Sequence, residues 1–252
     1  MKNLVKVLLA IAALFLLMGL MKNVIAQNIL TGAISAVAHV PVKAGGVEVR
    51  FSPASIRIKD LKVYNPSGFP DKLMLTMPQV FIDFVPGELL KGRAHLREVR
   101  LDLEELVVVR DSKGRLNVDA VKPTEHEKNE ARQKAKAPAG QKAPQLFIDK
   151  LSLSIGKVVY KDYSTGSAQP SVQTFDINIR NREFRNIDNP TAIVGLLMFE
   201  ALTRTTLSRL VNLDVNAFKE GGIQALSKGL GLVNDGSEKV QNTTKQILNL
   251  FK

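Results

Sequence analysis

Residues Ile56 to Phe69 read Ile-Arg-Ile-Lys-Asp-Leu-Lys-Val-Tyr-Asn-Pro-Ser-Gly-Phe. Apolar and polar residues alternate as on a half-buried β-strand, one extra residue intervenes before Leu61, and the alternation then resumes. A β-bulge inserts one residue in this way and keeps both halves of a strand facing one core. Asn65-Pro66-Ser67-Gly68 predicts a turn that ends the strand, because Pro66 lacks a backbone donor and Gly68 tolerates positive φ.

The apolar spacing of this strand recurs twice along the chain. Its three copies are Ile56, Ile58, Leu61 and Val63; Ala94, Leu96, Val99 and Leu101; and Leu146, Ile148, Leu151 and Leu153. In each copy a charged residue, Asp60, Glu98 or Lys150, precedes the third apolar position. The copies start about forty and then about fifty residues apart, so they predict a loose repeat of strand units and not a regular solenoid. Any half-buried strand can show the same pattern, which is the alternative.

Other alternating segments extend the predicted sheet from Val42 to Ile179. Residues 73–85 carry apolar side chains on both faces, so this strand is either covered on both sides or lines an apolar groove. Residues 94–110 predict one long strand with a dry and a wet face, on which Asp102 and Glu104 are solvated. Asp111-Ser112-Lys113-Gly114 predicts a turn, after which residues 115–118 return as a strand.

The N-terminal segment is the most apolar part of the chain. Lys2 and Lys6 precede an uninterrupted apolar run from Val7 to Met21. As a helix this run spans about 22 Å, somewhat less than a bilayer core of about 30 Å. A signal peptide cleaved near Val24-Ile25-Ala26 is the alternative, but we favour an uncleaved anchor; on either interpretation the rest of the chain is exported. The anchor residues are Val7, Leu8, Leu9, Leu14, Phe15, Leu16 and Leu17.

Composition divides the chain into three parts. Residues 1–23 form the predicted transmembrane anchor, and residues 24–187 form the β-sheet domain, with a packed helix at 24–40 and a flexible charged insertion at 122–145. The insertion has no large apolar residue and cannot bury enough surface to offset its chain entropy. Residues 188–252 form a helical tail in which Asn189 and Pro190 start a helix. We expect these C-terminal helices to be amphipathic, packed on the sheet or lying on a membrane.

The predicted fold class is therefore α+β: an N-terminal transmembrane helix, a curved and mostly antiparallel β-sheet with bulged strands, and C-terminal amphipathic helices.

Composition excludes several kinds of chemistry. The 252-residue chain contains no Cys, which excludes disulfides, a thiolate nucleophile and Cys-based zinc sites. His39, His95 and His126 share no metal-ligand spacing, and no nucleophile, phosphate-loop or dinucleotide motif is present. We therefore expect no enzyme, no cofactor and no metal. The net charge of +11 would suit nucleic acid, but the cations are spread along polar strand faces and aromatics make up only 6%, so we expect no nucleic-acid partner.

Several motifs, in this order, resemble those of the AsmA-like proteins of the bacterial envelope. An N-terminal anchor and a helix lead to strands and to Leu61-Lys62-Val63-Tyr64-Asn65-Pro66-Ser67-Gly68-Phe69. Leu89-Leu90-Lys91-Gly92 then precedes a strand, and Gly114-Arg115-Leu116-Asn117 follows it. The resemblance covers residues 1 to 120 and, more weakly, 146 to 165. This chain departs from the large members of the family in being short, with one charged insertion and a helical tail.

The resemblance implies non-enzymatic work in the envelope: outer-membrane assembly, or phospholipid transport along an apolar β-groove. It implies a single-pass protein of the bacterial inner membrane with its bulk in the periplasm, and phospholipid or other envelope proteins as partners. The alternative is an anchored scaffold that binds envelope proteins through its helical tail without lipid cargo. The candidate lipid-groove residues are Val80, Ile82, Phe84, Val99, Leu101, Leu103, Leu151 and Leu153.

Overall fold

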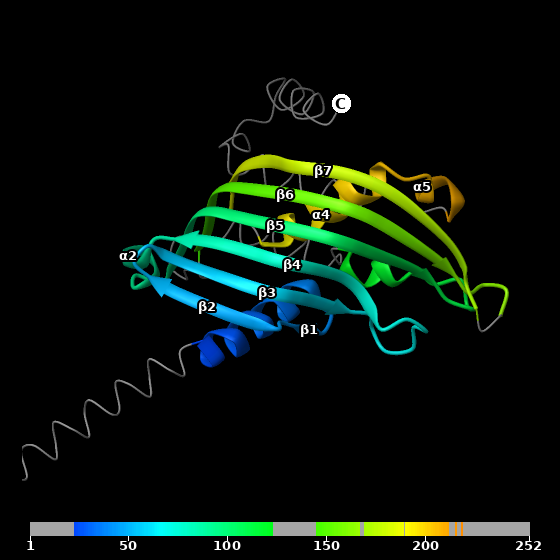
Figure 1. The fold of residues 1–252 in the computed structure, drawn as a ribbon, viewed down its shortest axis with the longest axis horizontal. Coiled ribbons are helices and arrows are strands. Elements are labelled where there is room, and N and C mark those ends of the chain that lie inside the picture. The colour runs from blue at the N-terminus through cyan, green and yellow to red at the C-terminus, as the bar shows by residue number, and fades with distance from the viewer. Residues whose placement is uncertain are drawn as a thin grey trace, which may run out of the picture.

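The computed structural model describes residues 23–122, 145–166, 169–188 and 190–211, together with Val215 and Phe218. These residues form an α+β fold around one large, curved sheet that does not close on itself (Figure 1). The predicted class and curved sheet are thereby confirmed. The predicted anchor residues, nearly all of the charged insertion and the last predicted helix lie outside the described residues. Among the helices that are described, none combines the length and the apolar character that crossing a membrane requires.

The sheet has seven strands, and it is antiparallel everywhere except at one pair. β1 and β2 both pair with β3, and β4, β5, β6 and β7 follow in chain order. β5 and β6 are parallel, so the sheet is mixed. The bounds are β1 Val42–Lys43, β2 Gly46–Phe51, β3 Ala54–Tyr64, β4 Leu73–Phe84, β5 Arg93–Arg110, β6 Gln145–Asp162 and β7 Ser171–Ile187.

Short helical elements accompany the sheet. A helix covers residues 23–38, and the named elements are α2 Pro86–Leu89, the 3-10 helix η1 Asn117–Val121, α4 Pro190–Thr203 and α5 Leu207–Leu210. Figure 1 shows α4 behind the sheet, and α4 contacts β6 and β7. Side chains from helix 23–38, η1, α4 and the strands share one apolar core, which includes Ala38, Val118 and Leu196. Helix 23–38, η1 and α4 thus cover one face of the sheet, which we call the inner face.

Helix α4 differs from the amphipathic helix that the sequence predicted. It begins at Pro190 as expected, but every described side chain from Ile193 to Leu202 is buried or half-buried, including Glu200. A helix that is apolar around its whole circumference belongs to a core and not to a surface. Glu200 lies within 2.8 Å of the Arg182 guanidinium of β7, which accounts for a carboxylate in this position.

The interruption predicted at Asp60 is part of a line that crosses the sheet. Asp60 has a φ of 50°, but the β3–β4 register does not shift there, because β4 changes its own alternation between Met77 and Val80. The feature is therefore a matched change in two strands and not a bulge in β3 alone. β5 and β6 change in the same way around Glu104 and Gly156, and β7 has register shifts and positive φ angles near Asn178 and Asn181.

The second and third copies of the sequence repeat lie side by side. In the parallel pair of β5 and β6, the residue partners are Ala94 with Leu146, Leu96 with Ile148, Val99 with Leu151 and Leu101 with Leu153. The charged residues of the two copies, Glu98 and Lys150, form an ion pair at 2.7 Å. On β5 the copy contains a bulge, because the register with β4 shifts between Asp83 and Phe84. The repeated pattern therefore has a structural counterpart in neighbouring strands.

Candidate functional site: the inner face and the polar clasp

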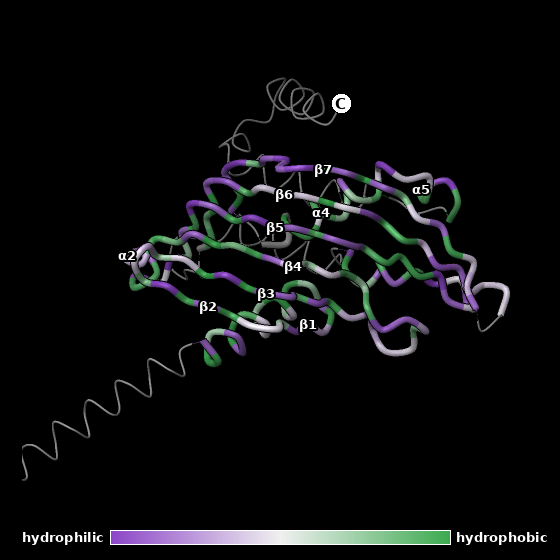
Figure 2. Tube along the Cα trace, viewed as in Figure 1, coloured by the Kyte–Doolittle hydropathy of each residue, from purple (hydrophilic) through white to green (hydrophobic). Residues whose placement is uncertain are grey.

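The inner face carries an unbroken apolar row across five strands. Val47, Ile58, Val80, Leu101 and Leu153 are successive register partners from β2 to β6. Each of them is at most 8% exposed. Figure 2 shows hydrophobic and hydrophilic residues alternating along the strands, as a sheet with one dry face requires.

The eight predicted groove residues fall on or beside this row. Seven are buried, and Ile82 is half-buried. Ile82, Val99 and Leu151 form the next row toward α2, and Leu103 lies in the same core. Phe84 is buried at the end of β4, outside that core cluster. The structure thus gathers these residues on one surface, and their contact with lipid stays a prediction.

Part of the inner face is accessible near α2. Val49, Ile56 and Ile82 are register partners on β2, β3 and β4, and all three are half-buried. The same row continues on β5, β6 and β7 with buried residues (Val99, Leu151 and Phe184). An apolar ligand would therefore meet the inner face first on β2 to β4, at the end of the sheet that carries α2.

Helix 23–38 is fixed to the edge of the sheet by side-chain hydrogen bonds. The backbone N–H of Val49 donates to Asn23 Oδ1 at 3.1 Å, and Gln27 Nε2 donates to the Ala44 carbonyl at 2.8 Å. These bonds occupy backbone groups that the edge strand would otherwise leave unpaired. The helix therefore starts beside the α2 end of β2 and forms one wall of the inner face.

The outer face of the sheet is polar and ion-paired. Asp102 and Glu104 are exposed, as the sequence predicted. Lys157 pairs with Glu105 at 2.7 Å across β5 and β6, in addition to the Glu98–Lys150 pair. The half-buried ring of Phe81 lies 4.3 Å from the Arg100 guanidinium carbon. This face is suited to solvent, so the inner face is the candidate surface for an apolar ligand.

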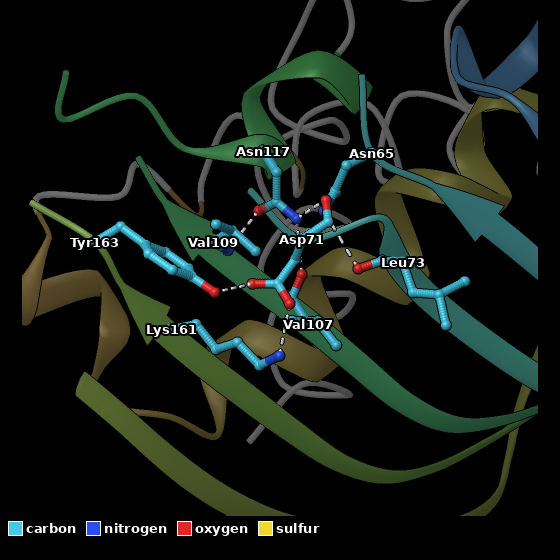
Figure 3. Close-up of polar contacts among 8 residues, drawn as sticks. All are labelled: Asn65, Asp71, Leu73, Val107, Val109, Asn117, Lys161 and Tyr163. Atoms are coloured by element: carbon cyan, nitrogen blue, oxygen red, sulfur yellow. Dashed lines mark hydrogen bonds and ion pairs between the residues drawn. The ribbon is translucent and has the colours of Figure 1, made fainter. Parts of the chain in front are cut away.

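A group of five polar residues joins the loops at the opposite end of the sheet, and we call it the polar clasp (Figure 3). Asn117 Nδ2 donates to Asn65 Oδ1 and to the Val107 carbonyl, both at 2.7 Å, and the Val109 N–H donates to Asn117 Oδ1 at 2.8 Å. Asn65 Nδ2 donates to the carbonyls of Asp71 (2.9 Å) and Leu73 (3.2 Å). The members of the clasp are Asn65, Asp71, Asn117, Lys161 and Tyr163.

The Asp71 carboxylate completes the clasp. Lys161 Nζ donates to Asp71 Oδ1 at 2.7 Å, and the Tyr163 hydroxyl donates to Asp71 Oδ2 at 2.9 Å. Burial, and then the hydrogen bond to Asp71, raise the pKa of Tyr163. The clasp thus connects the β3–β4 loop to β5, η1 and the end of β6. Its hydrogen bonds give it a structural role, which is to hold these segments together.

The clasp also explains why residues 115–118 do not return as a strand, contrary to the sequence prediction. Only Leu116 forms a bridge, to Arg110, and η1 begins at Asn117. The Asn117 amide bonds the Val107 carbonyl and the Val109 N–H, which are the groups that a returning strand would have used.

Asn65 in its turn and Asn117 in the Gly114–Asn117 motif each have a local explanation in the sequence, which does not indicate that they bind each other. The turn chemistry is present, since Gly68 has a φ of 94°. However, both amides are buried, and a buried amide needs partners. Their positions in two motifs after apolar strands were the available signal.

The part of the chain that the structure describes contains no cluster of three or more His, Asp or Glu side chains able to hold a metal. His95 instead bonds Asp149, with Nε2 3.0 Å from Oδ1, and its ring lies edge-on to Phe147 at 5.5 Å between centroids.

The structure defines the class of an α+β protein built on an open, curved sheet, with one apolar face covered by helices and one ion-paired face. The chain belongs to the AsmA family, whose family model matches residues 1–210. Members of this family are bacterial envelope proteins with a broad role in envelope assembly or lipid transport. No curated protein and no solved structure matches the chain.

Proposed function

We propose that this protein binds the acyl chains of phospholipids on the inner face of its sheet, as a membrane-anchored periplasmic protein that catalyses no reaction. Its contribution to envelope assembly would be to hold or pass lipid along the apolar rows. The observation that carries the proposal is the half-buried row of Val49, Ile56 and Ile82, which continues directly into buried apolar rows.

Two physical arguments support a lipid over a polar ligand. Sites for small molecules are mostly apolar with few polar groups. The row of register partners from Val47 on β2 to Leu153 on β6 contains no polar side chain, and neither does the neighbouring row from Val49 to Leu151. In addition, the half-buried residues Val49, Ile56 and Ile82 lie next to the buried rows, so an acyl chain that enters there would stay in contact with apolar side chains. Acyl chains are long, flexible and apolar, and they match such a surface.

Lipid analysis of paired variants tests the proposal. The full chain is extracted in mild detergent, and bound phospholipid is measured by mass spectrometry for the wild type, Ile82→Asn and Phe81→Asn. The two positions are adjacent on β4 and both half-buried, but Ile82 is on the inner face and Phe81 on the outer face. We expect Ile82→Asn to lose most of the bound lipid and Phe81→Asn to retain it, with circular dichroism confirming that both variants fold.

The scaffold hypothesis predicts a different result. If no phospholipid accompanies the wild type, and if deletion of residues 221–252 abolishes co-purification of envelope proteins while the sheet stays folded, the lipid proposal is wrong. Equal lipid loss in both folded variants would also contradict a role for the inner face.

A further inference from the structure

Exposed apolar side chains gather at the end of the molecule that carries α2. Nine large apolar side chains are exposed among the described residues, and six of them lie at this end. Phe51 ends β2, Leu89 and Leu90 belong to the α2 turn, and Phe147 lies near the start of β6. Figure 1 shows α2 beside the ends of β2 and β4 at one extremity of the sheet. Isolated exposed apolar residues are ordinary, but such a gathering marks an interaction surface.

Helix 23–38 contributes the other two residues. Val24 and Ile25 are exposed in its first turn. The hydrogen bond from Val49 to Asn23 places the start of this helix beside the last residues of β2, and therefore beside Phe51.

The α2 turn is the most prominent part of this surface. Leu90 is 90% exposed and Leu89 is 56% exposed, although both are large apolar residues at a tight turn. Lys91 and Arg93 follow them, are exposed, and form ion pairs with Glu88. An apolar tip flanked by cations is typical of segments that enter the interfacial zone of a bilayer, where the cations stay among the headgroups.

The N-terminal apolar run indicates what the exposed apolar side chains at the α2 end contact. The uninterrupted run from Val7 to Met21 joins the described chain at its first residue, Asn23, and this is the same end of the molecule. We propose that the α2 end lies against the bilayer, with Leu89 and Leu90 inserted into its interface as a second membrane contact. The inference rests on the proposed membrane location of the protein.

This placement gives the inner face an entrance. The half-buried residues Val49, Ile56 and Ile82 are on the α2 side of the buried rows, so they would open toward the bilayer. A phospholipid leaving the membrane would meet these side chains before any buried row.

Depth measurements on single-cysteine variants test the second contact. The chain has no Cys, so each variant carries one label. The full chain is reconstituted in nanodiscs of phosphatidylethanolamine and phosphatidylglycerol, with an environment-sensitive fluorophore at Leu89→Cys or Leu90→Cys. Val172→Cys and Leu210→Cys are matched controls, because these residues are 54% and 50% exposed and lie away from α2. Lipids with a nitroxide high on the acyl chain quench labels within the interface, which reaches about 5–10 Å into the headgroup and acyl boundary.

We expect several-fold stronger quenching at Leu89 and Leu90 than at the controls. Equal quenching at all four positions overturns the inference. The inference is also overturned if nitroxide lipids do not quench the labels but a nitroxide on a second copy of the chain does. Failure here is distinguishable from failure of the proposed function. If the Leu90 label is not quenched but Ile82→Asn loses its lipid, only the second membrane contact is refuted. If the label is quenched but Ile82→Asn keeps its lipid, the second contact is supported and lipid binding on the inner face is refuted.

Discussion

Removal of the Asn117 side chain tests whether the polar clasp is a structural element of the fold. Asn117 is fully buried and uses both ends of its amide. In Asn117→Ala, the Val107 carbonyl, the Val109 N–H and Asn65 Oδ1 each lose a partner. All three belong to a loop and a strand end that the clasp holds together, so few alternative partners are within reach.

The magnitude follows from these three hydrogen bonds. Their lengths are 2.7, 2.7 and 2.8 Å, and a typical bond contributes about 0.5–1.5 kcal/mol net. A buried group that is left without a partner costs about 1–3 kcal/mol, so the sum exceeds that of three exposed bonds. We expect Asn117→Ala to lower the free energy of unfolding by about 3–4 kcal/mol, a large share of the about 5–15 kcal/mol that is usual for a domain.

Urea unfolding of the full chain in detergent, followed by circular dichroism, measures this loss. A double-mutant cycle with Asn65→Ala isolates the contact between the two amides, and we expect a coupling free energy of about 1 kcal/mol. Gln79→Ala is the control, since Gln79 is an exposed amide on the same sheet and should change stability by less than about 0.5 kcal/mol. A loss below about 1 kcal/mol in Asn117→Ala, or strict additivity with Asn65→Ala, would refute the structural role of the clasp.

Two further predictions concern the sheet. A Cβ at Gly156 would lie 2.6 Å from the Glu104 carbonyl oxygen, so Gly156→Ala should destabilise the fold by about 1–3 kcal/mol in thermal unfolding. Gly87→Ala is the control, because a Cβ at Gly87 would meet no neighbouring atom within 4 Å. Equal melting points of the two variants would contradict this prediction. Burial, with a hydrogen bond to Asp162, raises the pKa of Tyr160 to about 12. Because the folded state holds this proton above the unfolded pKa of about 10, the contribution of Tyr160 to stability is present below pH 10 and lost toward pH 12. Tyr160→Phe should flatten that pH dependence, and an unchanged profile would show the assignment to be wrong.

The strands of the sheet were largely predictable from the sequence, because each depends on a local period of two. The change of alternation before Leu61 and the long strand from Ala94 to Arg110 were both visible as residue patterns. The pairing of β5 with β6 was not visible, since alternating residues indicate a buried face and not the neighbouring strand or its direction. The second and third copies of the apolar repeat, which contain Val99 and Leu151, indicate only that the two strands have similar patterns.

The contacts of the polar clasp and the burial of α4 could not be predicted from the sequence, for different reasons. The contact between Asn65 and Asn117 joins residues 52 positions apart, and each residue also had a sufficient local explanation as a turn former. The charged residues Glu200, Arg204 and Arg209 follow the apolar run of α4 and favour an amphipathic helix. However, Glu200 is buried beside Arg182 of β7, and that cation can be placed only once the sheet is known.

The line of altered alternation through β3, β4, β5 and β6 connects the shape of the sheet to its apolar face. A strand of 18 residues such as β5 twists along its length, so strict alternation would turn its apolar residues away from a common core. Local irregularities bend a strand and increase its twist, and here the strands change together, at Asp60, Glu104 and Gly156 among other positions. Each strand then presents apolar residues to the same side before and after the change. The sheet can therefore curve without closing and still keep a continuous apolar inner face, which the proposed binding of acyl chains requires.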